Sequence, residues 1–175
     1  MKRKINIWDY TGQIMDSMDP GVLVTTKADG KVNTMTIGWG MVGVQWRRNM
    51  FILYVRESRY TKQMLEKNPE FTINVPLGEP DKHVAVFCGT KSGRDMDKIK
   101  ELGLTLEEPT SISVPGIKEL PLTLECRVIY RQDQDPQAIP EVVSKRYYPP
   151  FYEDGRSDYH TIYYGEILDA YIIED

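Results

Sequence analysis

The sequence is poor in the residues that bind metals or form disulfide frameworks. Its 175 residues include only two cysteines, Cys88 and Cys126, and two histidines, His83 and His160, which are scattered along the chain. Structural zinc sites and disulfide scaffolds need such residues in closely spaced sets. This scarcity argues against a metal site, and we expect free thiols and isolated imidazoles.

Excess positive charge and long apolar runs are also lacking. The formal net charge is -4 and the pI is near 5.3, whereas nucleic-acid binding draws its affinity from clustered Lys and Arg. No stretch approaches the ~20 apolar residues of a membrane span, and no apolar stretch follows the basic start of the chain. We therefore expect a cytoplasmic protein that binds neither nucleic acid nor membrane.

The chain does contain enough apolar residues for one packed core. Its length is that of one domain and 41% of its residues are hydrophobic, so we expect a single domain over residues 1–175. Eleven tyrosines and three tryptophans suit both sheet packing and the binding of flat ligands. Sheet packing accounts for most of them.

Alternating residue patterns predict mainly strands. Residues 21–26 and 32–39 flank an Asp-Gly turn and should form a hairpin. Residues 41–49 are predicted to be a loop or strand end, and two full helices are expected, one capped by Ser58. Other expected elements are strands at 50–55, 71–75, 111–114 and 122–132, a strand pair over 159–173 bent near Gly165, a short helical piece at 83–87, and a helix from Arg94 that ends at Gly103. The predicted fold is mainly β, a small antiparallel barrel with a few helical insertions.

The strand over residues 33–39 carries an unusual set of side chains for a core strand. Asn33, Met35, Ile37 and Trp39 should share one face, and Thr36 and Gly38 the other. Amide, hydroxyls and a glycine beside an indole suit a flat polar ligand along the backbone. A half-exposed barrel strand is the alternative interpretation.

Two further stretches offer hydrogen-bond donors to a ligand. Residues 56–62 place Arg56, Ser58, Tyr60 and Thr61 at a predicted helix start, which suits a phosphate, although Ser58 could simply cap the helix. The turn Cys88-Gly89-Thr90-Lys91-Ser92-Gly93 lacks the residue order of a nucleotide-triphosphatase loop. Its Lys91 and Ser92 could still face the edge of a ligand ring; an ordinary turn is the alternative.

Taken in order, several motifs resemble the flavin reductase-like, FMN-binding split-barrel family, which includes flavoredoxin and the reductase components of two-component monooxygenases. These motifs are Asn33-x-Met35-Thr36-x-x-Trp39, Ser58-x-Tyr60-Thr61, Phe71-x-x-Asn74-Val75-Pro76, Cys88-Gly89-x-x-Ser92-Gly93-x-x-x-Asp97-Lys98 and His160-Thr161-x-x-Tyr164-Gly165-Glu166. The resemblance implies a Greek-key split barrel and a homodimer with FMN near the interface. The cofactor-binding residues it implies are Asn33, Met35, Thr36, Ile37, Gly38, Trp39, Arg56, Ser58, Tyr60, Thr61, Cys88, Gly89, Lys91, Ser92 and Gly93.

The function that follows is an FMN-dependent oxidoreductase that passes hydride from NAD(P)H to flavin and on to a flavin or protein electron acceptor. The alternatives are an electron carrier without a nicotinamide site, and a non-enzymatic barrel that binds a ligand or protein. His160 is the candidate catalytic residue, because an unperturbed imidazole is available in either charge state near neutrality. The sequence departs from the family's pattern at two places. One is Gly38, and the other is Gln45-Trp46-Arg47-Arg48, which stands where the family has a Pro-Pro pair. The proline- and tyrosine-rich residues 134–158 are expected to cap the ligand site or cover a partner subunit.

Overall fold

The computed structural model describes residues 1–174, and strands form most of its regular structure. In chain order the elements are β1 (Lys2–Lys4), the 3-10 turn η1 (Ile7–Asp9), α1 (Thr11–Asp16), β2 (Val22–Ala28), β3 (Lys31–Ile37), β4 (Gly40–Gln45), β5 (Arg48–Arg56), α2 (Tyr60–Lys67), β6 (Glu70–Val75), α3 (Lys82–Thr90), α4 (Lys98–Leu102), β7 (Leu106–Glu107), β8 (Gly116–Ile117), β9 (Leu122–Asp133), η2 (Pro136–Ala138), α5 (Glu141–Tyr147) and β10 (His160–Ile173). Within residues 1–174, no helix is both long enough and apolar enough to cross a membrane.

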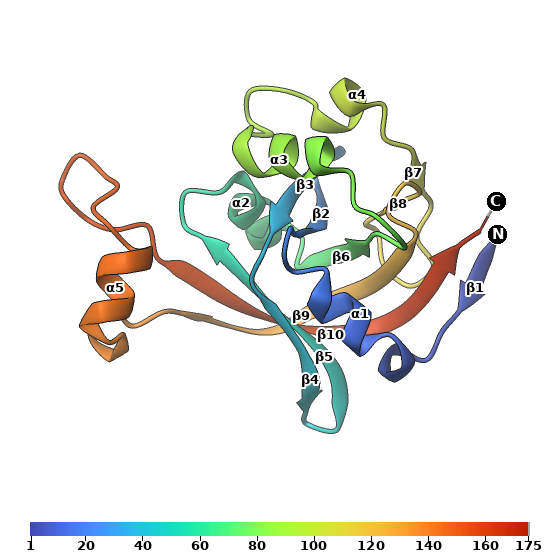
Figure 1. Ribbon diagram of the computed structural model, residues 1–175, viewed down its shortest axis with the longest axis horizontal. Coiled ribbons are helices and arrows are strands. Elements are labelled where there is room, and N and C mark those ends of the chain that lie inside the picture. The colour runs from blue at the N-terminus through green and yellow to red at the C-terminus, as the bar shows by residue number, and fades with distance from the viewer. Residues whose placement is uncertain (175) are drawn as a thin grey trace.

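One antiparallel sheet organises the molecule. Its strand order is β3-β2-β6-β9-β10-β5-β4, with β1 pairing to β10. Figure 1 shows β9 and β10 running through the centre, with α2, α3 and α4 on one side and the β4–β5 hairpin pointing away from them. The segment that contains α5 projects from the end of the long β9–β10 ribbon (Figure 1). The prediction of a mainly antiparallel β fold with helical insertions is confirmed.

The alternation read along residues 71–75 is confirmed in β6, and it explains how the core is built. Phe71, Ile73 and Val75 are fully buried in the main apolar cluster, and burying such a side chain contributes roughly 1.5–3 kcal/mol. Thr72 and Asn74 face the other way and are also buried, because the segment around β8 covers them. Thr72 Oγ1 donates to Pro115 O at 2.8 Å, and Asn74 Oδ1 accepts from Ile117 N at 3.0 Å.

The sheet contains two tight hairpins, β2–β3 and β4–β5, and the sequence predicted only the first. β2 and β3 pair from Val22↔Ile37 to Ala28↔Lys31 around Asp29-Gly30, both with positive φ. Residues 41–49 were predicted to be a loop or strand end, but they hold most of β4 and a hairpin turn at Trp46-Arg47 through which β4 pairs with β5. Trp46 and Arg47 also have positive φ, 51° and 59°. Two-residue turns of this kind usually carry Asn or Gly, so Trp46-Arg47 did not indicate a hairpin in the sequence.

Other predicted boundaries need correction. No strand forms at residues 111–114, where the loop is held instead by the buried Glu125 carboxylate, which accepts from Thr110 N and Ser111 N. The strand pair predicted over residues 159–173 is one strand, β10, with register shifts at Tyr164/Gly165 and Ile167/Asp169. Residues 1–174 contain five α-helices, not two. The helix predicted from Arg94 begins only at Lys98, and Gly103 ends it with a φ of 64°, as predicted.

The irregularity in β10 generates a stability prediction. A Cβ on Gly165 would lie 2.5 Å from Phe71 Cζ, and overpacking of this kind typically costs 1–3 kcal/mol. We expect Gly165→Ala to lower the free energy of unfolding in urea by about 1–3 kcal/mol. Gly12→Ala is the control, because Gly12 lies in α1 and a Cβ at this position would meet no heavy atom within 4 Å. Equal stability of Gly165→Ala and wild type would contradict the crowding.

Candidate functional site

A cationic pocket lies where β3, the start of α2 and the α3–α4 connection meet. Its volume is about 200 Å³, and its lining contains four cations and no carboxylate. The lining residues are Asn33, Met35, Ser58, Arg59, Tyr60, Thr61, Thr90, Lys91, Ser92, Gly93, Arg94, Lys98 and Phe151. Because the chain as a whole is acidic, this concentration of cations marks a place suited to an anion.

The start of α2 supplies backbone donors to the cationic pocket. Arg59 is the N-cap, with extended backbone and no side-chain capping bond, so the first N–H groups of the helix have no side-chain acceptor. The prediction that Ser58 caps this helix is wrong. Ser58 N and Oγ both donate to the Asp158 carboxylate, at 2.9 and 2.6 Å. Asp158 thereby ties the segment before α2 to the segment before β10.

Lys98 is a site residue that the sequence reading did not assign. Its side chain lines the cationic pocket but is only 3% exposed, and burial lowers its pKa to about 8. Its Nζ donates to Cys88 O at 3.2 Å and to Lys91 O at 3.1 Å, and no ion pair within residues 1–174 involves it. A buried charge without a counter-charge is costly. The sequence signal that could have identified Lys98 as a site residue was its place in the family motif, which ends in Asp97-Lys98.

Arg59 and Arg94 are also absent from the predicted site residues. Arg94 Nη1 donates to Ser58 O at 3.0 Å, and its guanidinium lies 5.5 Å from the Tyr60 ring centroid. Arg59 Nη1 donates to Gly89 O at 3.1 Å. These contacts hold the guanidinium groups of Arg59 and Arg94 in place. The N–H groups that they leave over can donate to an anion.

An aromatic pocket of about 150 Å³ adjoins the cationic pocket and shares Met35 and Arg59 with it. Its lining residues are Met35, Thr36, Ile37, Gly38, Trp39, Tyr54, Arg56, Arg59 and His160. The Trp39 ring is 40% exposed and its centroid lies 4.9 Å from that of His160. The two pockets therefore adjoin along β3, the first lined by cations and the second by flat rings together with Arg56 and Arg59.

His160 lines the aromatic pocket. Its Nδ1 is 3.0 Å from Tyr148 Oη, and its side chain is largely buried. Burial, and then the nearby Arg56 guanidinium, lower its pKa from 6.5 to about 4. The expectation that both charge states are available near neutrality is therefore wrong, and the imidazole is neutral there. It can act as a hydrogen-bonding group but carries no positive charge toward a ligand.

The structure brings together all the predicted cofactor-binding residues except Cys88 and Gly89. Cys88 is fully buried in a small apolar cluster, and burial raises its pKa to about 11. Gly89 contributes only its carbonyl, to Arg59. The predicted phosphate set is divided, because Ser58, Tyr60 and Thr61 line the cationic pocket whereas Arg56 lines the aromatic one.

Arg56 and Gly38 have neighbours that the sequence did not suggest. Arg56 donates to Asp158 O at 2.6 Å and to Tyr147 O at 2.9 Å, so its guanidinium already holds the projecting segment. A Cβ on Gly38 would lie 3.3 Å from Met18 O. A side chain at residue 38 would therefore crowd the backbone at Met18, in the turn after α1, first.

The fold and the site define a class of proteins: antiparallel split barrels in which a cationic and an aromatic pocket adjoin along one strand. Residues 15–175 match the family described as "Flavin reductase like domain". The chain belongs to this family.

Solved structures share the fold. Flavoredoxin from Methanosarcina acetivorans is 26% identical, with a TM-score of 0.65 over 88% of this chain and 69% of that chain. An FMN-binding domain of flavin reductase-like enzyme from Shewanella baltica is 18% identical, with a TM-score of 0.67 over 98% of this chain and 77% of that chain. An uncharacterised protein of Archaeoglobus fulgidus is 37% identical over 99 residues, which are 57% of this chain and 55% of that protein. The chain spans less than two thirds of the length of the curated relatives it matches.

The lowered pKa of His160 predicts a pH dependence of stability. The unfolded chain binds a proton near pH 6.5, whereas the folded chain does so only near pH 4. The low pKa of the folded chain therefore imposes no cost above pH 6.5. The free energy of unfolding decreases as the pH falls from 6.5 toward 4, because the unfolded chain binds the proton more readily. In urea titrations between pH 7 and 4, wild type should lose more stability than His160→Gln. Parallel curves for the two proteins would contradict the pKa.

Proposed function

We propose that this protein is an FMN-binding oxidoreductase that passes hydride from NAD(P)H to the flavin and electrons on to a flavin or protein acceptor. The observation that carries the proposal is the pair of adjoining pockets along β3, one cationic and the other aromatic, which share Met35 and Arg59. This polarity matches a cofactor with a phosphate at one end and a flat ring system at the other. Family membership supports the same cofactor.

The residues present fit the phosphate end of FMN. A phosphate dianion would meet Arg59, Lys91 and Arg94 without any carboxylate in the lining, and charge-assisted hydrogen bonds of this type are the strong ones. The N–H groups at the start of α2 add donors that require no side-chain movement. Lys98 would gain in the anion the counter-charge that it lacks among its contacts.

The aromatic end fits a ring that must be positioned and kept from water. Bound FMN would supply the hydride chemistry at its ring. The chain's own contribution is to orient the ring through the backbone of β3, flanked by Trp39 and Tyr54. His160, neutral and held by Tyr148, would orient a ligand by hydrogen bonding, not by charge. Phe151, from the projecting segment, lines the cationic pocket and covers part of it.

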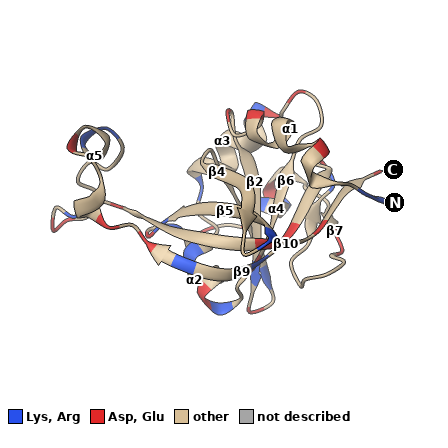
Figure 2. Cartoon of the chain, turned by 90° about the horizontal axis from the view of Figure 1, so that it is seen from below, with Lys and Arg blue, Asp and Glu red and all other residues tan. Residues whose placement is uncertain are grey.

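A homodimer completes the proposal, because an exposed apolar face continues from the aromatic pocket. Strand register places Met41, Ile52, Tyr164 and Tyr130 in one row across β4, β5, β10 and β9. Met41 is 50% and Tyr130 43% exposed, and the Trp46 ring lies 6.3 Å from that of Tyr130. Figure 2 shows few charged residues along β5 and the middle of β10. A second copy on this face would close the aromatic pocket beside Tyr54, since exposed apolar patches typically mark interfaces.

The experiment that tests the activity is an anaerobic titration of the purified, FMN-loaded protein with NADH and with NADPH. Bleaching of the flavin absorption by either nucleotide supports the oxidoreductase. A flavin that stays oxidised with both but is reduced by dithionite would favour the electron carrier. Failure to bind FMN at all would leave a non-enzymatic barrel.

The binding site itself is tested by Arg59→Ala, because Arg59 lines both pockets. Loss of one charge-assisted hydrogen bond costs about 1.5–3 kcal/mol, so the Kd for FMN should rise roughly ten- to hundredfold in a fluorescence titration. Arg131→Ala is the matched control, since this exposed arginine forms its ion pair with Glu66, at 3.8 Å, and lies outside both pockets. An equal Kd for both variants would contradict the placement of the phosphate.

The proposed interface is tested by Tyr130→Asp, which places a charge at the β9 end of the apolar row, beside Trp46. We expect the variant to sediment as a monomer and wild type as a dimer, because a buried unpaired charge is strongly unfavourable. Trp8→Asp, at another exposed aromatic residue on η1, should leave the mass unchanged. A monomeric wild type, or a dimeric Tyr130→Asp, would count against this interface.

A further inference from the structure

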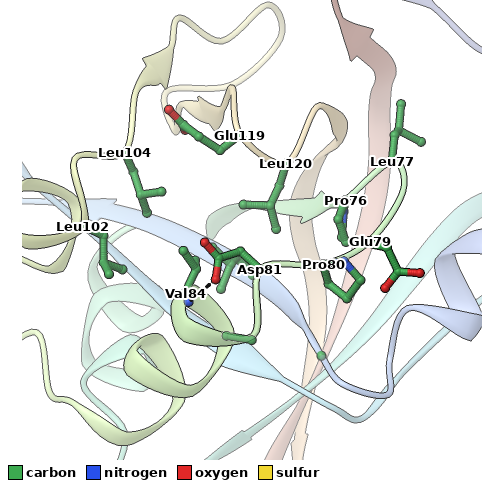
Figure 3. A pocket seen from close by; sticks show the side chains of 13 residues that line it. Pro76, Leu77, Glu79, Pro80, Asp81, Val84, Leu102, Leu104, Glu119 and Leu120 are labelled. Carbon is green, nitrogen blue, oxygen red and sulfur yellow. Dashed lines mark hydrogen bonds between the residues drawn. The ribbon is translucent and has the colours of Figure 1, made fainter.

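A second cavity, of about 230 Å³, lies beside the first turn of α3, whereas the cationic pocket lies at the other end of this helix, at Thr90. The segment after β6, the first turn of α3, the residues around the end of α4 and the segment before β9 enclose it (Figure 3). Leu23 forms its floor, and Val84, Leu102, Leu104 and Leu120 form its walls. The cavity shares no lining residue with either pocket of the candidate site.

The cavity opens one side of the second apolar cluster of the protein. Leu23 and Leu104 are buried members of this cluster, and Val84, Leu102 and Leu120 are packed against it while only partly buried. An apolar group that entered the cavity would therefore cover leucine and valine surface that now faces solvent. Removing such surface from water is favourable, at about 25 cal/mol per Å².

The charged lining of this cavity is entirely acidic. Glu79, Asp81 and Glu119 line it, with no Lys, Arg or His, and no ion pair within residues 1–174 involves any of them. Figure 3 shows the Asp81 carboxylate between Val84 and the leucines, with one hydrogen bond drawn to Val84 N. Asp81 Oδ1 caps α3 by accepting from His83 N at 2.8 Å and from Val84 N at 3.3 Å, which fixes its position.

We propose that this cavity binds a small organic cation, namely a protonated amine that carries a compact aromatic or branched apolar group. The apolar group would fill the space between the leucines, and the ammonium would pair with Asp81 and its acidic neighbours. Anionic ligands are repelled by the same carboxylates. A neutral ligand of the same shape gains the apolar contact but not the charge pairing, so the charge decides the selectivity of the site.

The cavity also has a physical link to β3. Ala85, in its wall, accepts a hydrogen bond through its carbonyl from Thr36 Oγ1 at 2.6 Å, and Thr36 lines the aromatic pocket. A ligand against α3 thus lies one hydrogen bond away from the candidate site. The binding of the amine itself requires no cofactor, so the inference stands or falls independently of the proposed function.

The test uses 2-phenylethylamine as the probe, with 2-phenylethanol and phenylacetate as comparisons of the same shape. In titrations of the full chain followed by amide NMR, the amine should bind with a Kd on the order of 1 mM, more tightly than the alcohol, and the acid should not bind. The shifted resonances should cluster at Leu23, Val84 and Leu120. Equal binding of amine and alcohol, no saturable binding, or shifts confined to Ser58–Thr61 would overturn the proposal.

Two variants separate charge from shape. Asp81→Asn keeps a good N-cap for α3 but removes the charge, so the Kd for the amine should rise about threefold while that for the alcohol stays unchanged. Asp97→Asn is the matched control, because Asp97 caps α4 in the same way, through Lys100 N at 3.1 Å, and does not line the cavity. Val84→Phe should fill the cavity and abolish binding of both probes. An amine Kd unaltered in Asp81→Asn would overturn the role of charge.

Discussion

The antiparallel pairing of β9 with β10 is the constraint on which the rest of the structure depends. It runs from Thr161↔Asp133 to Ile172↔Leu122 and joins β6 on one side to β5 on the other. Backbone groups in such a ladder satisfy one another, so the two halves of the sheet are fixed without polar cost. The same ribbon carries the segment with α5 at its end (Figure 1) and delivers His160 and Asp158 to the site.

The site gains its character from charge separation within an acidic protein. Four cations gather where the lining holds no carboxylate, whereas the cavity at the first turn of α3 holds three carboxylates and no cation. Opposite charges kept apart by one helix create two places with opposite ligand preferences. Asp158 accepts two hydrogen bonds from Ser58, which lines the cationic pocket, but Asp158 itself does not line it.

Much of the fold and part of the site could be predicted from the sequence, and the errors have a common cause. The hairpin at Asp29-Gly30, the alternation of β6 and the stop at Gly103 each follow from a few neighbouring residues. The errors arose where the local structure depends on a contact that the neighbouring sequence does not reveal. Trp46-Arg47 adopts a hairpin turn because β5 pairs with β4, and Ser58 binds Asp158, 100 residues away, in place of capping α2.

The sequence by itself determined the family, the antiparallel architecture and most residues that line the two pockets, because local periodicity, turn chemistry and motif order depend on short stretches of chain. Only the tertiary structure decided that His160 is neutral and that Lys98 is buried without a counter-charge. It also decided that Cys88 faces away from both pockets, into an apolar cluster. Burial and the charges of residues distant along the chain set these properties, and both exist only once the strands have packed.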